Sequence, residues 1–111
     1  MTKTFTSFVS AVIFLLSPSD AQTVDLGASR VTVIEPSYLP SWASFQVANM
    51  PPGCGWLSMH PDPADPIDVQ VAYTHGIYAT LMTAMMGDAT VQLFSNDGDD
   101  CTIENIHLVA P

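Results

Sequence analysis

The alternation of hydrophobic and polar residues predicts three strands in the first part of the chain. They lie in the segments TVDLGASRVTVIEP, ASFQVANM and CGWLSMH, with proline- or glycine-containing breaks between them. Residues 61–68 follow and contain three prolines, which lack backbone donors, and three aspartates, which favour water, so an exposed loop is predicted there. The next residues, VQVAY, are compatible with a further short extended segment.

A single helix of about three turns is predicted over residues 76–87. At 100° per residue, large apolar side chains occupy one half of this helix and small residues the other. The large half is most simply packed into the core, yet it is wider than the stripe of about 100° that a core-facing helix needs. Large residues at its flanks and the small residues are therefore expected to contact a second subunit. This predicted interface consists of Gly76, Ile77, Thr80, Thr83, Met86 and Gly87.

The final segment, ATVQLFSNDGDDCTIENIHLVA, predicts a hairpin. Two alternating runs flank the dipeptide Asp97-Gly98, which is a strong turn signal. The predicted element order is therefore β-β-β-α-β-β, which is the order of an OB-type barrel. We expect a mainly β protein with one helix, folded as a small five-stranded OB-like barrel in a single domain over residues 22–111.

The first 21 residues have the features of a secretory signal peptide. Lys3 gives a positive start, an apolar run extends from Phe8 to Leu16, and Ser19 and Ala21 form a small-x-small cleavage signature. A transmembrane anchor is the alternative, but the apolar run is shorter than the ~20 residues that spanning a bilayer requires. We expect a secreted or periplasmic bacterial protein that is cleaved after Ala21 and has no membrane span afterwards.

The chain is strongly acidic, with a formal net charge of −9. Removal of the predicted leader takes away Lys3 and Asp20, so the charge is unchanged and Arg30 is the only strong base that remains. Binding to nucleic acid phosphates needs clustered cations, and so does binding to anionic membrane surfaces. Nucleic acid is therefore excluded as a partner, and an anionic membrane surface is unfavourable. The acidity is interpreted mainly as an aid to solubility.

Cys54 and Cys101 are the only cysteines, and in an exported protein a disulfide is the natural interpretation. In the chain-entropy model, a loop of this length contributes roughly 4 kcal/mol of stability. A metal site is the alternative, but it needs more ligands than His60 and His107, the histidines nearest to the cysteines in sequence. We predict a disulfide and no metal.

An aromatic cluster is the strongest candidate for a ligand site. Tyr38, Trp42 and Phe45 lie close together near a loop, where aromatic faces can stack on sugar rings and nearby carboxylates or amides can bind hydroxyl groups. The alternative is that Trp42 and Phe45 only cap the barrel, because aromatic residues are usually buried. The predicted ligand-binding residues are Tyr38, Trp42, Glu35 and Gln46.

Catalytic and metal-binding patterns are weak. Ser58 and His60 share a face, with Asp62 beyond them, but a triad is defined by its geometry in space and Pro61 interrupts the alternation. The acidic hairpin NDGDD has oxygen ligands that suit calcium, yet it does not match a calcium loop, and a hydrated turn, which explains it without an ion, is favoured. We predict no enzymatic activity and no cofactor.

Three segments together carry a resemblance to a known family. IYATLMTAMMGDATVQLF followed by CTIENIHL, with CGW upstream, resembles the B subunits of pertussis-like and subtilase-type AB toxins over roughly Cys54 to Leu108. That resemblance implies an OB fold, a pentameric ring that binds cell-surface glycans, and an enzymatic A subunit as partner. It also implies a Cys54–Cys101 disulfide and a helix that faces the centre of the ring. No residues match the sialic-acid pocket of those toxins, so none is carried over.

Two functions remain open after this comparison. The first is an exported, non-enzymatic binding module that recognises a glycan or receptor as an oligomer. The second is a stand-alone secreted or periplasmic protein, structural or inhibitory, that shares only the fold.

Overall fold

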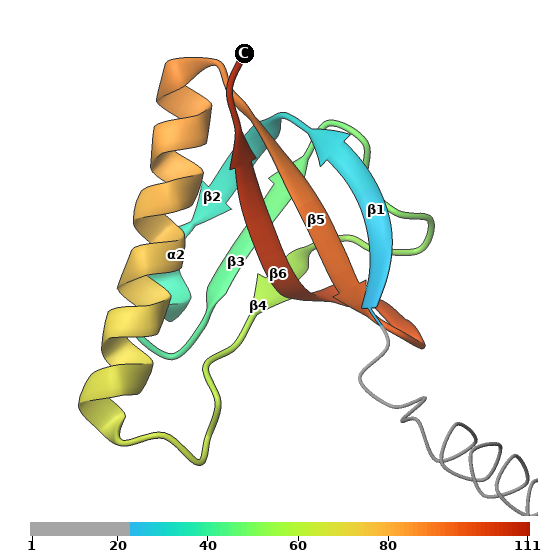
Figure 1. Cartoon of the computed structure of the whole chain (residues 1–111). Coiled ribbons are helices and arrows are strands. Elements are labelled where there is room, and N and C mark those ends of the chain that lie inside the picture. Colours follow the sequence, from blue (N-terminus) through green and yellow to red (C-terminus); the bar gives the residue numbers. More distant parts are fainter. Residues whose placement is uncertain (1–22) are drawn as a thin grey trace, which may run out of the picture.

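The computed structural model describes residues 23–111, so the predicted signal peptide lies outside the described residues. It contains six strands, one α-helix and a short 3-10 turn (Figure 1). In chain order the elements are β1 (Thr23–Ser29), β2 (Val31–Glu35), η1 (Pro36–Tyr38), β3 (Ala43–Val47), β4 (Leu57–Met59), α2 (Ile67–Gly87), β5 (Thr90–Asn96) and β6 (Asp99–Val109). The predicted mainly β class with one helix is therefore confirmed.

The strands form one mixed sheet in the order β1-β5-β6-β4-β3-β2. All neighbours are antiparallel except β4 and β6, which run parallel. The prediction of five strands closed into a barrel is not matched, because the segment expected to be the first strand is divided at Arg30. Its two parts, β1 and β2, lie at opposite ends of the sheet, and no strand pairing in the described chain joins them.

The sheet is strongly curved, because its two end strands are separated by a single residue in the chain. Two irregularities in the strand register accompany this curvature, one between Asp25 and Gly27 and one between Val31 and Val33. Bulges of this kind bend a strand and increase its twist. At the first of them, Gly27 adopts a φ of 85°, which glycine tolerates best, and its N–H donates to the Asp25 carboxylate at 2.8 Å.

The helix is longer than predicted, because it spans the 21 residues from Ile67 to Gly87. The VQVAY segment is helical and not extended. Pro66 has a φ of −57° and occupies the N-cap, so its missing N–H costs nothing at this position. Asp68 in the first turn suits the positive end of the helix dipole. At the other end, Asp88 adopts a left-handed conformation and its N–H donates to the carbonyl of Ala84.

The helix lies along one side of the curved sheet, where it packs against β2, β3 and β5 (Figure 1). Only Thr74, Leu81 and Ala84 of this helix are fully buried, so the large apolar half is not enclosed as a barrel plug would be. Met86 is 79% exposed. The core between the helix and the sheet is formed by Val31, Ala43, Phe45, Val47, Leu57, Met59, Leu81, Ala84, Ala89, Val91, Leu93 and Ile103.

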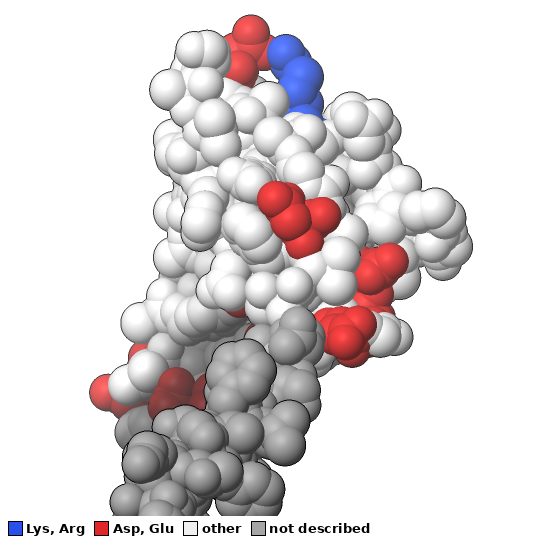
Figure 2. All heavy atoms as spheres, turned by 45° about the vertical axis from the view of Figure 1, so that its right-hand side comes forward, with Lys and Arg blue, Asp and Glu red and all other residues white. Residues whose placement is uncertain are grey.

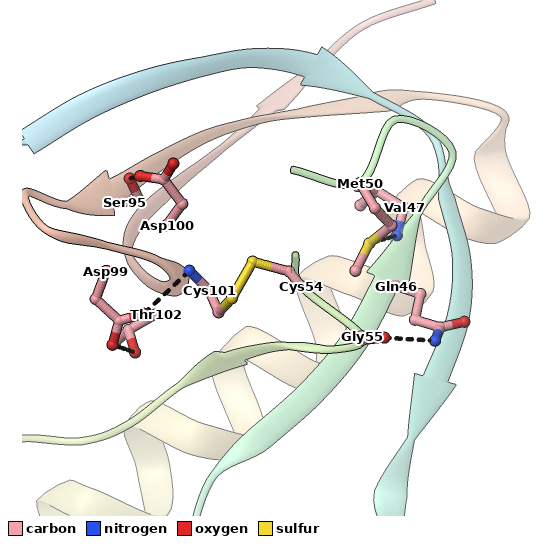
Figure 3. The surroundings of a disulfide bond; sticks show 10 residues. All are labelled: Gln46, Val47, Met50, Cys54, Gly55, Ser95, Asp99, Asp100, Cys101 and Thr102. Carbon is pink, nitrogen blue, oxygen red and sulfur yellow. Dashed lines mark hydrogen bonds between the residues drawn. A yellow bond between two sulfur atoms is a disulfide. The ribbon is translucent and has the colours of Figure 1, made fainter. Parts of the chain in front are cut away.

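The predicted disulfide between Cys54 and Cys101 is present, with the two Cα atoms 5.5 Å apart (Figure 3). It joins the loop before β4 to the start of β6. A disulfide is compatible with an extracellular or periplasmic protein. Within residues 23–111, no helix combines the length and the apolarity needed to cross a membrane.

The single buried leucine of α2 should carry much of the attachment of the helix. Leu81 is 0% exposed and lies in the core cluster, whereas Ile67, in the first turn of the same helix, is 72% exposed. We expect Leu81→Ala to lower the free energy of unfolding by about 2–5 kcal/mol, through lost burial and a residual cavity. Ile67→Ala should change it by less than about 0.5 kcal/mol. Urea unfolding of both variants under oxidising conditions measures the difference, and equal losses would contradict this packing.

Candidate functional site

A pocket of about 330 Å³ lies against β3, β4 and the start of β6. This volume is at the lower end of the range for small-molecule sites, about 300–1,000 Å³. Its lining combines three aromatic side chains, two serine hydroxyls and one half of the disulfide. The lining residues are Tyr38, Trp42, Ser44, Trp56, Ser58 and Cys101.

The serines reach the pocket because side chains alternate across a strand. On β3, Ala43 and Phe45 are buried in the core, so Ser44 between them faces the opposite side of the sheet. On β4, Leu57 and Met59 point into the core in the same way, which turns Ser58 outward. Because the two serines are direct partners in the β3–β4 ladder, their side chains lie next to each other on the outer face. They form a polar floor over the core.

Three aromatic rings are stacked at one side of this floor. The ring centroids of Tyr38 and Trp42 are 4.6 Å apart with an interplanar angle of 15°, and Trp42 stacks on His60 at 5.5 Å. His60 also approaches Ser58, with 3.0 Å between Nε2 and Oγ. Tyr38, at the end of the 3-10 turn, and Trp42 thus stack beside His60, the residue that follows β4. A stack of this kind offers a preformed apolar wall.

Trp56 contributes a further aromatic side chain to the pocket and is 44% exposed. It stands two residues after Cys54, whose disulfide partner Cys101 also lines the pocket. The amide of Gln46 donates to the carbonyl of Gly55 at 2.8 Å, so the residue between Cys54 and Trp56 is also held (Figure 3). The disulfide and this hydrogen bond hold the two residues that directly precede Trp56.

Glu35 supports the pocket from outside its lining. Its carboxylate accepts hydrogen bonds from the Ser37 N–H at 3.0 Å and the Ser37 hydroxyl at 2.6 Å, and it caps the 3-10 turn that ends in Tyr38. These bonds, that of the hydroxyl first, lower the pKa of Glu35 below its ordinary value of 4.5. The carboxylate therefore stays ionised at neutral pH while it positions the turn.

The structure brings together two of the four predicted ligand-binding residues. Tyr38 and Trp42 both line the pocket, whereas Glu35 and Gln46 act on neighbouring backbone. Three lining residues were missed by the sequence prediction, namely Ser44, Trp56 and Ser58. A signal for the last two was present, because Trp56, Ser58 and His60 alternate along one strand face together with Cys54. Nothing in the sequence placed Ser44 beside Ser58, since that requires the strand register.

The Ser58–His60 contact does not extend to Asp62. The Asp62 carboxylate accepts from the Ala64 N–H at 2.9 Å, which closes a local turn. In the described chain, the hydrogen bonds of His60 thus include a serine but no carboxylate. A serine nucleophile needs a base that is itself oriented by a third group, and this arrangement supplies only the first two members.

In the acidic hairpin at the β5–β6 turn, carboxylates accept hydrogen bonds from backbone and side-chain groups of the same hairpin. Asp99 accepts from the Thr102 hydroxyl at 2.7 Å and from the Cys101 N–H at 3.2 Å, while Asp100 accepts from Ser95 (Figure 3). The Thr102 bond is the main cause that lowers the pKa of Asp99. Within residues 23–111, no three His, Cys, Asp or Glu residues are grouped to hold a metal ion.

The charge around the pocket is negative or neutral. Its lining contains no charged residue. Arg30, the one Lys or Arg of the described residues, forms an ion pair with Asp88, the residue that follows α2 (Figure 2). The face of the molecule drawn in Figure 2 carries other acidic side chains and no second basic residue.

The predicted helical interface is largely accessible. Gly76, Thr83, Met86 and Gly87 are exposed, and Ile77 and Thr80 are half-buried. Both threonine hydroxyls donate to carbonyls one turn earlier, Thr80 to Gly76 at 2.9 Å and Thr83 to Ala79 at 2.8 Å. The face therefore offers few free polar groups.

Comparisons with protein-family models, with curated protein sequences and with solved structures found no match to this chain.

The capping role of Glu35 predicts a pH-dependent aromatic stack. Because its folded-state pKa is lowered, the ionised cap contributes fully above pH 4.5 and is lost as the pH falls through that lowered pKa. Near-ultraviolet circular dichroism of the Tyr38–Trp42 stack should therefore weaken on acidification. Glu35→Ala should show the weakened signal already at pH 7. Glu35→Gln retains an acceptor oxygen and should keep the signal with less pH dependence. Identical titrations of all three proteins would contradict this role.

Proposed function

We propose that this protein is an exported, non-enzymatic module that binds a carbohydrate in the pocket between Tyr38, Trp42 and Trp56. The observation that carries the proposal is the combination of aromatic side chains and a two-serine floor in one cavity. Sugar rings present apolar C–H faces and polar edges. An aromatic wall beside hydroxyl donors and acceptors complements both features.

The exposed aromatic surface and the fixed backbone of the site also support this ligand class. Tyr38 is 46% exposed and Trp56 is 44% exposed, so both retain apolar surface that a ligand can cover. The polypeptide around them is held by the disulfide, by the Glu35 cap and by the Gln46–Gly55 bond. A preformed site loses less conformational entropy on binding than a mobile one. Rigid aromatic anchors with adaptable hydroxyls are thus favourable for recognition of a small polar ring.

We further propose an OB-like path for the chain, with Thr23–Glu35 counted as one bent strand. The support is that β1 and β2 are consecutive in the chain yet pair with β5 and β3 at the two ends of the sheet. The remaining elements then follow in the order β, β, α, β, β. A toxin B-subunit-like role, with a glycan receptor and an A subunit as partners, is the extension of this proposal. Export is supported by the disulfide.

The second part of the proposal is self-association through α2. From Val69 to Gly87 the helix carries no Asp, Glu, Lys or Arg, although the whole chain has a net charge of −9. Two copies of so acidic a chain repel each other least where charge is absent. Exposed Met86 adds apolar surface, and Gly76 and Thr83 allow close approach. A second copy of this chain is therefore the occupant that we assign to this face.

Removal of either tryptophan should weaken sugar binding. We expect Trp42→Ala and Trp56→Ala to raise the dissociation constant at least about tenfold, because buried aromatic anchors dominate binding energy. Leu108→Ala is the matched control, since Leu108 is 47% exposed on β6 but lies outside the pocket lining. A glycan array identifies the ligand, and calorimetry with the best hit measures each variant. Failure of the oxidised wild-type protein to bind any glycan would favour a stand-alone structural or inhibitory role.

A negative charge on the outer face of α2 should separate the copies. We expect Thr83→Asp to raise the self-dissociation constant by about tenfold or more, because an unpaired charge is costly to bury. Asn49→Asp adds the same charge at an exposed position outside the helix and should leave association unchanged. Light scattering over a concentration series measures both variants. A wild-type protein that stays monomeric at millimolar concentration would remove this part of the proposal.

A further inference from the structure

We propose that the pocket is selective for neutral saccharides and discriminates against sugars that carry a carboxylate, such as uronic or sialic acids. This inference rests on the proposed carbohydrate-binding function and names its ligand class. It depends on the distribution of charge around the pocket and not on the aromatic wall.

Two carboxylates border the pocket, although neither lines it. Glu35 is the direct partner of Ser44 in the β2–β3 ladder, so its backbone is adjacent to that of a floor residue. Asp99 accepts a hydrogen bond from the N–H of Cys101, which is itself a lining residue. An anionic sugar would therefore enter a site with one acidic residue on β2 and another on β6, the strands on either side of β3 and β4.

Both carboxylates remain negative under ordinary conditions. Each accepts a hydroxyl and a backbone N–H, Glu35 from Ser37 and Asp99 from Thr102 and Cys101. These bonds favour the ionised form, so the pKa of each group lies below its ordinary value. Protonation consequently does not relieve the repulsion of an anionic ligand at neutral pH.

No lysine or arginine of residues 23–111 lies in the pocket lining. Arg30 precedes β2, and Glu35 ends this strand, so the two are separated by roughly 16 Å of extended chain. Arg30 is also paired with Asp88 beyond the end of α2. A carboxylate on the ligand would therefore meet hydroxyls, aromatic rings, the His60 imidazole beside Ser58 and two nearby acids, without the bidentate guanidinium partner that favours its recognition.

Matched sugars that differ only at C6 test this inference. Calorimetric titration compares the methyl glycosides of glucose, galactose and mannose with the methyl glycosides of the corresponding uronic acids, whose carboxyl group is free. We expect the uronide of the best-binding sugar to bind more weakly by roughly fourfold or more, since each carboxylate at about 10 Å in water contributes about a twofold effect. Raising the salt concentration should bring the dissociation constants of the uronide and the neutral sugar closer together, and it should leave that of the neutral sugar unchanged.

Charge-removing variants assign the effect to the two acids. Glu35→Gln and Asp99→Asn retain an acceptor oxygen and should reduce the preference for the neutral sugar by about twofold each. Asp68→Asn removes an acid from the start of α2, outside the pocket, and should leave the preference unchanged. The preference is a ratio within one protein, so a general loss of affinity or stability in a variant does not imitate the result.

The outcomes separate this inference from the proposed function. Binding of neutral sugars that is insensitive to salt, together with a preference over the uronides that decreases as salt is added, supports both. Equal or tighter binding of the uronides overturns the neutral selectivity and leaves carbohydrate binding intact. The absence of binding by either series, and by an array of neutral and acidic oligosaccharides, overturns the carbohydrate-binding function and this inference with it.

Discussion

The Cys54–Cys101 disulfide is the constraint on which the sheet and the pocket both depend. The β5–β6 and β1–β5 ladders form one part of the sheet, and β2, β3 and β4 form the other. These parts meet at the parallel β4–β6 contact, where Ser58 and Thr102 are the single paired positions. So short a ladder provides little stability. The disulfide ends at Cys101, the residue before Thr102, and thus holds the sheet where its hydrogen bonding is weakest.

The pocket is a consequence of the same junction. Core packing of Phe45 and Leu57 forces Ser44 and Ser58 to the outer face, and the register of β3 and β4 places these serines side by side. The disulfide then brings Cys101 to the edge of this floor, and the short link from Cys54 carries Trp56 to the same place. The sheet junction and the pocket therefore share one covalent bond, and reduction removes the support of both.

Several features could be predicted because local patterns determine them. The Asp97-Gly98 turn, the strands around it and the disulfide follow from turn chemistry, alternation and compartment. The first part of α2 was missed because Val69 and Val71 are β-branched and follow a proline-rich loop, whereas packing of Thr74 and Leu81 outweighs that preference. The division of the first strand and the meeting of Ser44 with Ser58 depend on strand pairing, which local periodicity does not specify.

The pocket and the outer face of α2 lie on opposite sides of the molecule's core, and this separation affects what an assembly could do. Phe45 is buried on the helix side of β3, while its neighbour Ser44 lines the pocket on the other side. Association through α2 would consequently leave the pocket of each copy open. Because linked weak sites gain avidity from effective concentration without new contacts, an assembly of this kind would compensate for the modest affinity expected of a small, neutral sugar site. The stretch of α2 from Val69 to Gly87 and the pocket lining both lack Asp, Glu, Lys and Arg, and on this acidic chain we propose the first for a second copy and the second for a ligand.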